Sequence, residues 1–93
     1  MEGPPLGAVD PSGRMVALQL YEGALKIIPL TPTGRVNEPF SVRLEEANVL
    51  DLCFLHGSGS KPTVAVLYAD QRGARHVKTY AVAVRDREAV PGG

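Results

Sequence analysis

Apolar residues alternate with polar ones along much of the chain, and this period of two residues is typical of β-strands. Phe40, Val42 and Leu44 are apolar, whereas Ser41 and Arg43 between them are polar, so the three apolar side chains are predicted to point inward. The same kind of pattern predicts strands over residues 15–20, 24–30, 40–44, 49–55, 63–68 and 75–84. The chain is therefore predicted to be all-β.

Residues 49–55 carry apolar side chains at both alternations, with Leu52 and Phe54 on one and Val49 on the other. Apolar residues on both faces are typical of a strand that is buried on both sides, so this run is predicted to be a central strand. The preceding residues 44–50 also have apolar positions at helical spacing, but the strand pattern that follows favours a turn.

Glycine and proline separate the predicted strands. Asp10, Pro11 and Gly13 have the pattern of a turn, because proline presets its φ angle and glycine tolerates the last position. Gly23 is placed in a tight hairpin loop, which requires a positive φ. Residues 86–93 combine mixed charges with proline and glycine, so they are predicted to form a loose, solvated tail.

A weak internal repeat relates residues 16–21 to residues 64–68. Both segments end in tyrosine before an acidic turn that contains glycine, and they lie roughly 50 residues apart, near the spacing of propeller blades. We therefore predict about two incomplete four-stranded antiparallel blades of a WD40-like β-propeller, with three strands placed in each. One blade part spans residues 9–47 and the next spans residues 48–85. Because a propeller closes with about four to eight blades, the chain is interpreted as a piece of one.

Composition and charge exclude several classes of protein. The 93 residues carry 10 Lys+Arg and 10 Asp+Glu, so the net charge of zero gives no electrostatic footprint for nucleic acid or anionic membranes. The apolar fraction of 44% is typical of a globular chain, and no apolar run approaches the ~20 residues needed to cross a bilayer. A single cysteine and the lack of a secretory signal pattern favour the nucleus or cytoplasm.

Neither catalytic nor metal-binding chemistry is favoured. Cys53 lies in mid-strand among apolar residues, so it is interpreted as a buried hydrophobic residue rather than as a nucleophile with His56 as its base. Cys53, His56 and His76 lack the spacing of a metal site, and no cofactor is expected. The stretch 57–61 lacks the spacing of a phosphate-binding loop and is interpreted as a linker. The adjacent carboxylates Glu45 and Glu46 are assigned to a solvated turn.

Arg72, Arg75 and Lys78 form the one local basic cluster of the sequence, with His76 between them. Strand alternation places Arg75 on the face opposite to His76 and Lys78, so the cluster is predicted to be divided between two faces. A solvated hairpin tip is the simpler interpretation, and contact with phosphate is the alternative.

Three segments carry distinctive combinations of residues: the hairpin Tyr-acid-Gly with the following Lys-x-Ile-Pro-Leu in residues 21–30, Val-Arg-Leu-Glu-Glu at 42–46, and Arg-His-Val-Lys-Thr-Tyr at 75–80. In these segments the chain resembles the first β-propeller of the DNA damage-binding protein 1 family, the large subunit of the UV-damaged-DNA-binding complex. The resemblance covers about residues 9–88, and residues 1–8 are left as a non-matching lead. The chain is accordingly interpreted as a truncated product or a partial gene model.

This resemblance implies a non-enzymatic scaffold, part of an adaptor that links a cullin-RING ubiquitin ligase to substrate-receptor proteins. It implies a nuclear location, also cytoplasmic, and a role in DNA repair and ubiquitination, with no membrane partner. In such adaptors the first propeller helps to hold the receptor, and Arg43 is our candidate partner contact, the alternative being a salt-bridged surface arginine. The alternative function is a nucleic-acid-binding propeller related to the pre-mRNA cleavage and splicing scaffolds.

Overall fold

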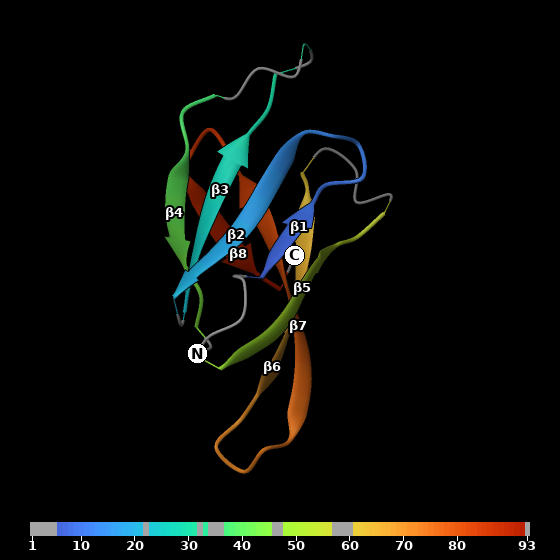
Figure 1. The fold of residues 1–93 in the computed structure, drawn as a ribbon, viewed down its shortest axis with the longest axis vertical. Coiled ribbons are helices and arrows are strands. Elements are labelled where there is room, and N and C mark those ends of the chain that lie inside the picture. The colour runs from blue at the N-terminus through green and yellow to red at the C-terminus, as the bar shows by residue number, and fades with distance from the viewer. Residues whose placement is uncertain are drawn as a thin grey trace.

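The computed structural model describes residues 6–21, 23–31, 33, 37–45, 48–56 and 61–92. Within this part of the chain, eight β-strands form two four-stranded antiparallel sheets (Figure 1). The first sheet has the order β1 (Gly7–Val9), β2 (Met15–Tyr21), β3 (Ala24–Pro29) and β4 (Phe40–Arg43). The second has the order β5 (Val49–Phe54), β6 (Thr63–Ala69), β7 (Arg75–Ala83) and β8 (Glu88–Pro91). The predicted all-β class with antiparallel blade-like sheets is confirmed.

Strand register decides which side chains of the first sheet face the core. Ala17 pairs with Ile27, and Ile27 pairs with Phe40, so these three buried side chains form one row on the inner face. The neighbouring pair, Val16 and Ile28, lies on the opposite face and is only half-buried. Alternation along the chain thus becomes a division between a buried face and an outer face.

The second sheet follows the same rule. Phe54 pairs with Val64, and Val64 pairs with Tyr80, which gives a buried row across three strands. Leu67 pairs with Val77 on the outer face, where Val77 is 67% exposed.

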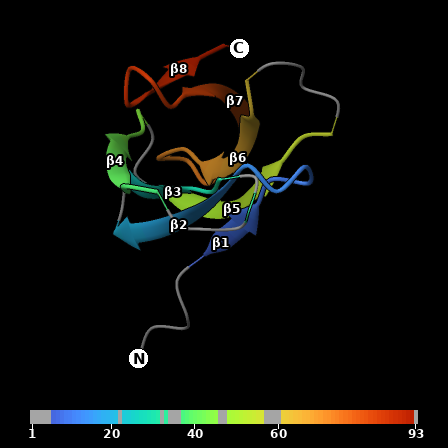
Figure 2. The same cartoon turned by 90° about the horizontal axis from the view of Figure 1, so that it is seen from above.

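The core lies between the inner faces of the two sheets, which pack face to face. Figure 2 shows β1 beside β5 and β4 beside β8, and these pairs of strands are in contact. One cluster of buried side chains joins both sheets, comprising Met15, Ala17, Leu25, Ile27, Phe40, Val42, Leu44, Leu52, Phe54, Val64, Val66, Tyr80 and Val82.

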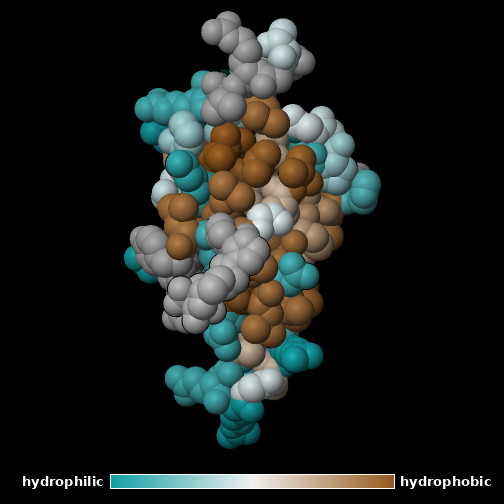
Figure 3. Space-filling model, viewed as in Figure 1, coloured by the Kyte–Doolittle hydropathy of each residue, from teal (hydrophilic) through white to brown (hydrophobic). Residues whose placement is uncertain are grey.

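Both outer faces also carry apolar residues. Val9, at 62% exposure, lies next to Val16 on the outer face of the first sheet, and Figure 3 shows hydrophobic side chains gathered on the side where β1 and β2 face the viewer. On the second sheet, Cys53, Leu67 and Val77 line a shallow apolar depression of about 140 Å³. Each sheet therefore buries one apolar face and exposes apolar residues on the other.

Two strands lie where the sequence pattern predicts none. Residues 7–9 form β1, which falls largely within the expected lead, and residues 88–91 form β8, so the prediction of a loose tail is wrong for those residues. β8 pairs with the end of β7, and the backbone N–H of Gly92 donates to the carbonyl of Thr79 at 2.9 Å. Each sheet thus has four strands, where the pattern placed three.

Gly7 of β1 lies against a side chain of β2. Gly7 lies opposite Leu18, and a Cβ atom at Gly7 would lie only 2.9 Å from Cδ2 of Leu18. A side chain there would have to displace Leu18. Gly7 therefore leaves room for the side chain of Leu18, a role that hydrophobic alternation does not indicate.

The prediction of a central strand over residues 49–55 is also wrong. β5 is the terminal strand of its sheet, and two of its outer-face residues, Asp51 and Cys53, are exposed. The two-sided pattern arises because the outer face of the sheet also carries apolar residues, among them Leu67 and Val77, and not because β5 has a neighbour on each edge.

Candidate functional site

The β6–β7 hairpin projects beyond the body of the two sheets (Figure 1). Its turn is closed by a hydrogen bond from the backbone N–H of Gly73 to the carbonyl of Asp70, and Gly73 has a φ of 85°. The carboxylate of Asp70 also accepts from the backbone N–H groups of Arg72 and Ala74, each at 2.9 Å. These bonds fix the shape of an otherwise exposed tip.

His76 braces the same turn from β7. Its Nε2 atom lies 2.8 Å from Oδ2 of Asp70, and its ring stacks on Tyr68 with the centroids 5.3 Å apart. The hydrogen bond with His76, together with those from the backbone of Ala74 and Arg72, lowers the pKa of Asp70 although desolvation opposes this. Asp70 therefore places a negative charge among the basic residues of the tip.

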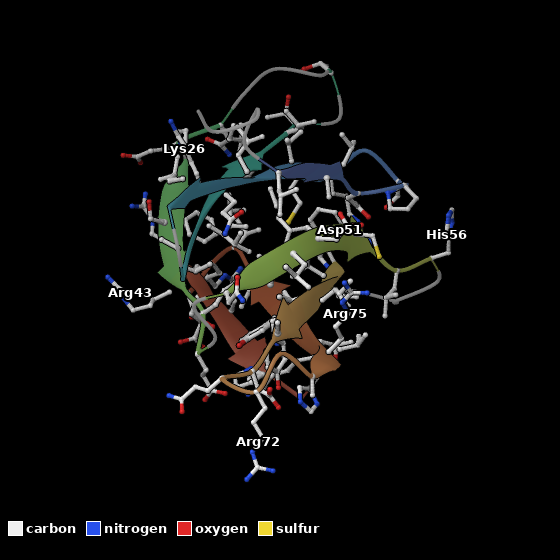
Figure 4. All side chains as sticks on the ribbon, turned by 60° about the horizontal axis from the view of Figure 1, so that its bottom comes forward. Lys26, Arg43, Asp51, His56, Arg72 and Arg75 are labelled. Atoms are coloured by element: carbon white, nitrogen blue, oxygen red, sulfur yellow. The ribbon has the colours of Figure 1, made fainter. Side chains whose placement is uncertain are left out.

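Register divides the basic cluster as the sequence predicts. Arg75 pairs with Ala69, whereas His76 pairs with Tyr68, so Arg75 and His76 lie on opposite faces of the hairpin. Arg72 is exposed and extends away from the tip (Figure 4).

Lys78 belongs to a second group of contacts, which joins the two sheets. It forms an ion pair with Glu45, and its Nζ lies 5.8 Å from the centroid of the Tyr80 ring. The hydroxyl of Tyr80 accepts a hydrogen bond at 3.1 Å from the backbone N–H of Glu45. Glu45 is exposed, as expected for the turn, whereas Glu46 lies outside the described residues. Alternation along the chain predicts a strand at Tyr80 but does not indicate this contact.

Arg43, the candidate partner contact, lies at the end of β4 with its side chain exposed. It points away from the sheets in Figure 4 and forms no ion pair with any described residue. The structure therefore places Arg43 where a partner can reach it, and its role as a contact stays a prediction.

The cysteine and histidine candidates are not brought together into a catalytic site. Cys53 is exposed on the outer face of β5, so its predicted burial is wrong. His56 lies in the connection after β5 and points away from the molecule in Figure 4. Among the described residues, no group of three His, Cys, Asp or Glu side chains could hold a metal ion. Most of the loop at 57–61 lies outside the described residues, and Lys61 at its end is exposed.

No helix in the described part of the chain is long and apolar enough to span a bilayer.

Asp10 is the buried carboxylate of this part of the chain, with 2% exposure. It accepts hydrogen bonds from Nε of Arg14 at 2.7 Å, from Oγ of Ser12 at 2.9 Å and from the backbone N–H of Arg14 at 3.0 Å. Burial raises the pKa of Asp10, but these bonds and the charge of Arg14 outweigh it and lower the pKa to about 2. The predicted turn at Asp10 is thus held by an ion pair that the sequence pattern did not indicate.

Comparisons with known proteins all point to the same family of β-propeller proteins. The family described as the RSE1/DDB1/CPSF1 first beta-propeller matches residues 5–91, a range that includes all of β1 and all of β8. DNA damage-binding proteins 1a and 1b of Arabidopsis thaliana are each 49% identical to the chain over 87 residues, and DNA damage-binding protein 1 of Oryza sativa subsp. japonica is 49% identical as well. These matches cover 94% of the chain and 8% of each relative, so the chain spans a small part of the length of the curated relatives it matches.

Proposed function

Because the chain belongs to the RSE1/DDB1/CPSF1 first β-propeller family, we propose that its two sheets act as adjacent blades of a protein-interaction scaffold. The scaffold is a non-enzymatic adaptor that presents substrate-receptor proteins to a cullin-RING ubiquitin ligase in response to DNA damage. It acts in the nucleus and also in the cytoplasm. Arg43 is the candidate contact for a receptor, since a guanidinium binds a carboxylate through two parallel hydrogen bonds.

The apolar outer faces are the observation that carries this proposal. Val9 and Val16 on the first sheet, and Leu67 and Val77 on the second, face away from the shared core. In a propeller each blade is covered on both faces by its neighbours, so apolar residues on both faces of both sheets are what the architecture requires. An independent two-sheet sandwich would instead have polar outer faces.

A chimeric adaptor tests the scaffold role. Residues 5–91 of the chain, the range that the family matches, would replace the corresponding segment of Arabidopsis DNA damage-binding protein 1a. Binding of a purified substrate receptor would be compared with that of the unmodified relative. We expect the two affinities to agree within about tenfold, or ~1.4 kcal/mol. A chimera that melts like its parent but no longer binds the receptor would contradict the proposal.

Cys53 reports directly whether a neighbouring blade covers the second sheet. Its thiol is exposed in the chain alone, so it should react readily with a thiol reagent, and in the chimera we expect labelling to slow by about tenfold or more. Mass spectrometry of the Cys53 peptide gives the rate. The matched control combines Cys53→Ser with Arg72→Cys, which puts the thiol on the hairpin tip and should label equally fast in both proteins. Equal labelling of Cys53 in the two proteins would refute blade packing on this face.

The salt dependence of DNA binding tests the nucleic-acid alternative, and we expect only weak binding. Two exposed arginines at the tip, Arg72 and Arg75, can contact about two phosphates, and Asp70 lies beside them. The logarithm of the binding constant should then fall with a slope of about −2 against the logarithm of salt concentration, so binding near physiological salt is expected to be negligible. Fluorescence anisotropy with a labelled DNA duplex measures this. A slope of about −5 that Arg72→Ala reduces by about one would favour the alternative.

A further inference from the structure

A groove lies between the two sheets at the end opposite to the β6–β7 hairpin. It has a volume of about 440 Å³ and is lined from the first sheet by the region of Arg14, Met15 and Pro29, and from the second by Lys61, Pro62 and the residues 82–86. We call it the inter-sheet groove. Its size is in the range of sites that hold a small ligand or a few side chains of a peptide.

The walls of the inter-sheet groove are held by backbone hydrogen bonds. On one side, the N–H of Leu30 donates to the carbonyl of Arg14 at 2.8 Å, and on the other, the N–H of Val82 donates to the carbonyl of Pro62 at 2.8 Å. Arg14 is itself fixed by the carboxylate of Asp10. The groove is therefore shaped before any ligand arrives, which reduces the ordering needed for binding.

The groove has an apolar base and a basic rim. Met15, Pro62 and Val82 are buried and supply apolar surface. Lys61 and Arg85 are exposed and form no ion pair with any described residue, while Arg14 is paired with Asp10. Asp86 is the one acidic residue in the lining, so Lys61 and Arg85 give the rim an excess of positive charge.

The position of the groove keeps it open in a propeller. Neighbouring blades pack against the faces of a blade, whereas the groove lies at the ends of the strands, where connecting segments meet solvent. The apolar outer faces are thus reserved for blade packing, and the groove remains accessible. Arg43 lies at the opposite end of the sheets, so the groove is a separate surface from that candidate contact.

We propose that the inter-sheet groove binds an extended peptide segment of a partner protein in which aspartate or glutamate stands next to a large apolar side chain. The apolar side chain lies on the base formed around Met15 and Val82, and the carboxylate pairs with Lys61 or Arg85 at the rim. The choice of a protein partner rests on the proposed scaffold role. The charge of the rim and the apolar base are properties of the groove itself.

Fluorescence anisotropy of labelled hexapeptides tests the proposal on the full chain. One peptide alternates leucine with glutamate, and its matched peptide carries glutamine in place of glutamate. We expect the glutamate peptide to bind about tenfold or more tightly than the glutamine peptide. The double variant Lys61→Glu, Arg85→Glu should lose this preference. Absence of binding by a chain that melts cooperatively would overturn the proposal.

A charge-matched control separates groove binding from general attraction. The double variant Arg72→Glu, Arg75→Glu makes the same change in charge at the hairpin, far from the groove, and should retain peptide binding within about twofold. Equal loss in both double variants would overturn the proposal, as would more effective competition by a single-stranded oligonucleotide than by the unlabelled peptide.

The free chain can self-associate through its outer faces, which would obscure peptide binding. The same substitutions are therefore also made in the chimeric adaptor, where neighbouring blades cover those faces. Receptor capture and peptide binding are then read out separately. Loss of receptor capture with peptide binding intact would contradict the scaffold role and leave the groove assignment standing. Receptor capture without peptide binding would refute the groove assignment alone.

Discussion

Replacing Tyr80 by alanine is expected to lower the free energy of unfolding by about 3 to 5 kcal/mol, a large share of the stability of a domain of this size. Tyr80 is 1% exposed and lies in the row with Phe54 and Val64, so truncation leaves a cavity in the centre of the shared core. It also removes the acceptor for the N–H of Glu45. Urea unfolding followed by circular dichroism measures the loss.

The variant Tyr80→Phe separates packing from hydrogen bonding. Phenylalanine keeps the ring in the core and removes only the hydroxyl, so we expect a loss of about 1 kcal/mol. Glu45 is exposed, and water can take over as the acceptor for its N–H. If the phenylalanine variant were as unstable as the alanine variant, the stabilising role assigned to the buried ring would be wrong.

Acid is expected to remove about 2.5 kcal/mol of stability through Asp10 alone. Its pKa is about 2 in the folded chain against an ordinary pKa of 3.8, so the folded state favours the ionised carboxylate. The contribution is fully present above pH 3.8 and is lost as the pH falls through about 2. Denaturant midpoints measured between pH 6 and pH 2 give the size of this loss.

The variant Asp10→Asn should be less stable than the parent near neutral pH, by about 2 kcal/mol, and less sensitive to acid. Asparagine is uncharged, so it leaves Arg14 without its carboxylate partner. Asp86→Asn removes the same charge from an exposed turn and serves as the control, with an expected change within about 0.5 kcal/mol. An unchanged acid response in Asp10→Asn would show that other carboxylates cause the loss.

Alternation was sufficient to predict six strands because each of them has one face in the core. The segment around Phe40 and Val42 is the clearest case, since buried and exposed residues alternate there without exception. β1 (Gly-Ala-Val) and β8 (Glu-Ala-Val-Pro) lack a regular alternation of large apolar and polar residues, and none of their residues is fully buried. Their strand conformation comes from pairing with β2 and β7, which is information that lies elsewhere in the chain.

For the candidate surfaces, the sequence predicts only those arrangements that are set by residues close together in the chain. The division of Arg75 from His76 follows from alternation within one strand, and it was predicted. The contact of Tyr80 with Glu45 joins residues 35 positions apart, and the inter-sheet groove needs both sheets in place. The exposure of Cys53 was missed because an apolar surrounding indicates burial whether or not a neighbouring blade is present.

The exposed apolar residues on the outer faces of the two sheets also have a consequence during protein synthesis. As the polypeptide leaves the ribosome, Val9 and Val77 can associate with other exposed hydrophobic surfaces until neighbouring blades cover them. Molecular chaperones that shield such surfaces should therefore bind this region early, and cells short of them should accumulate it in insoluble form.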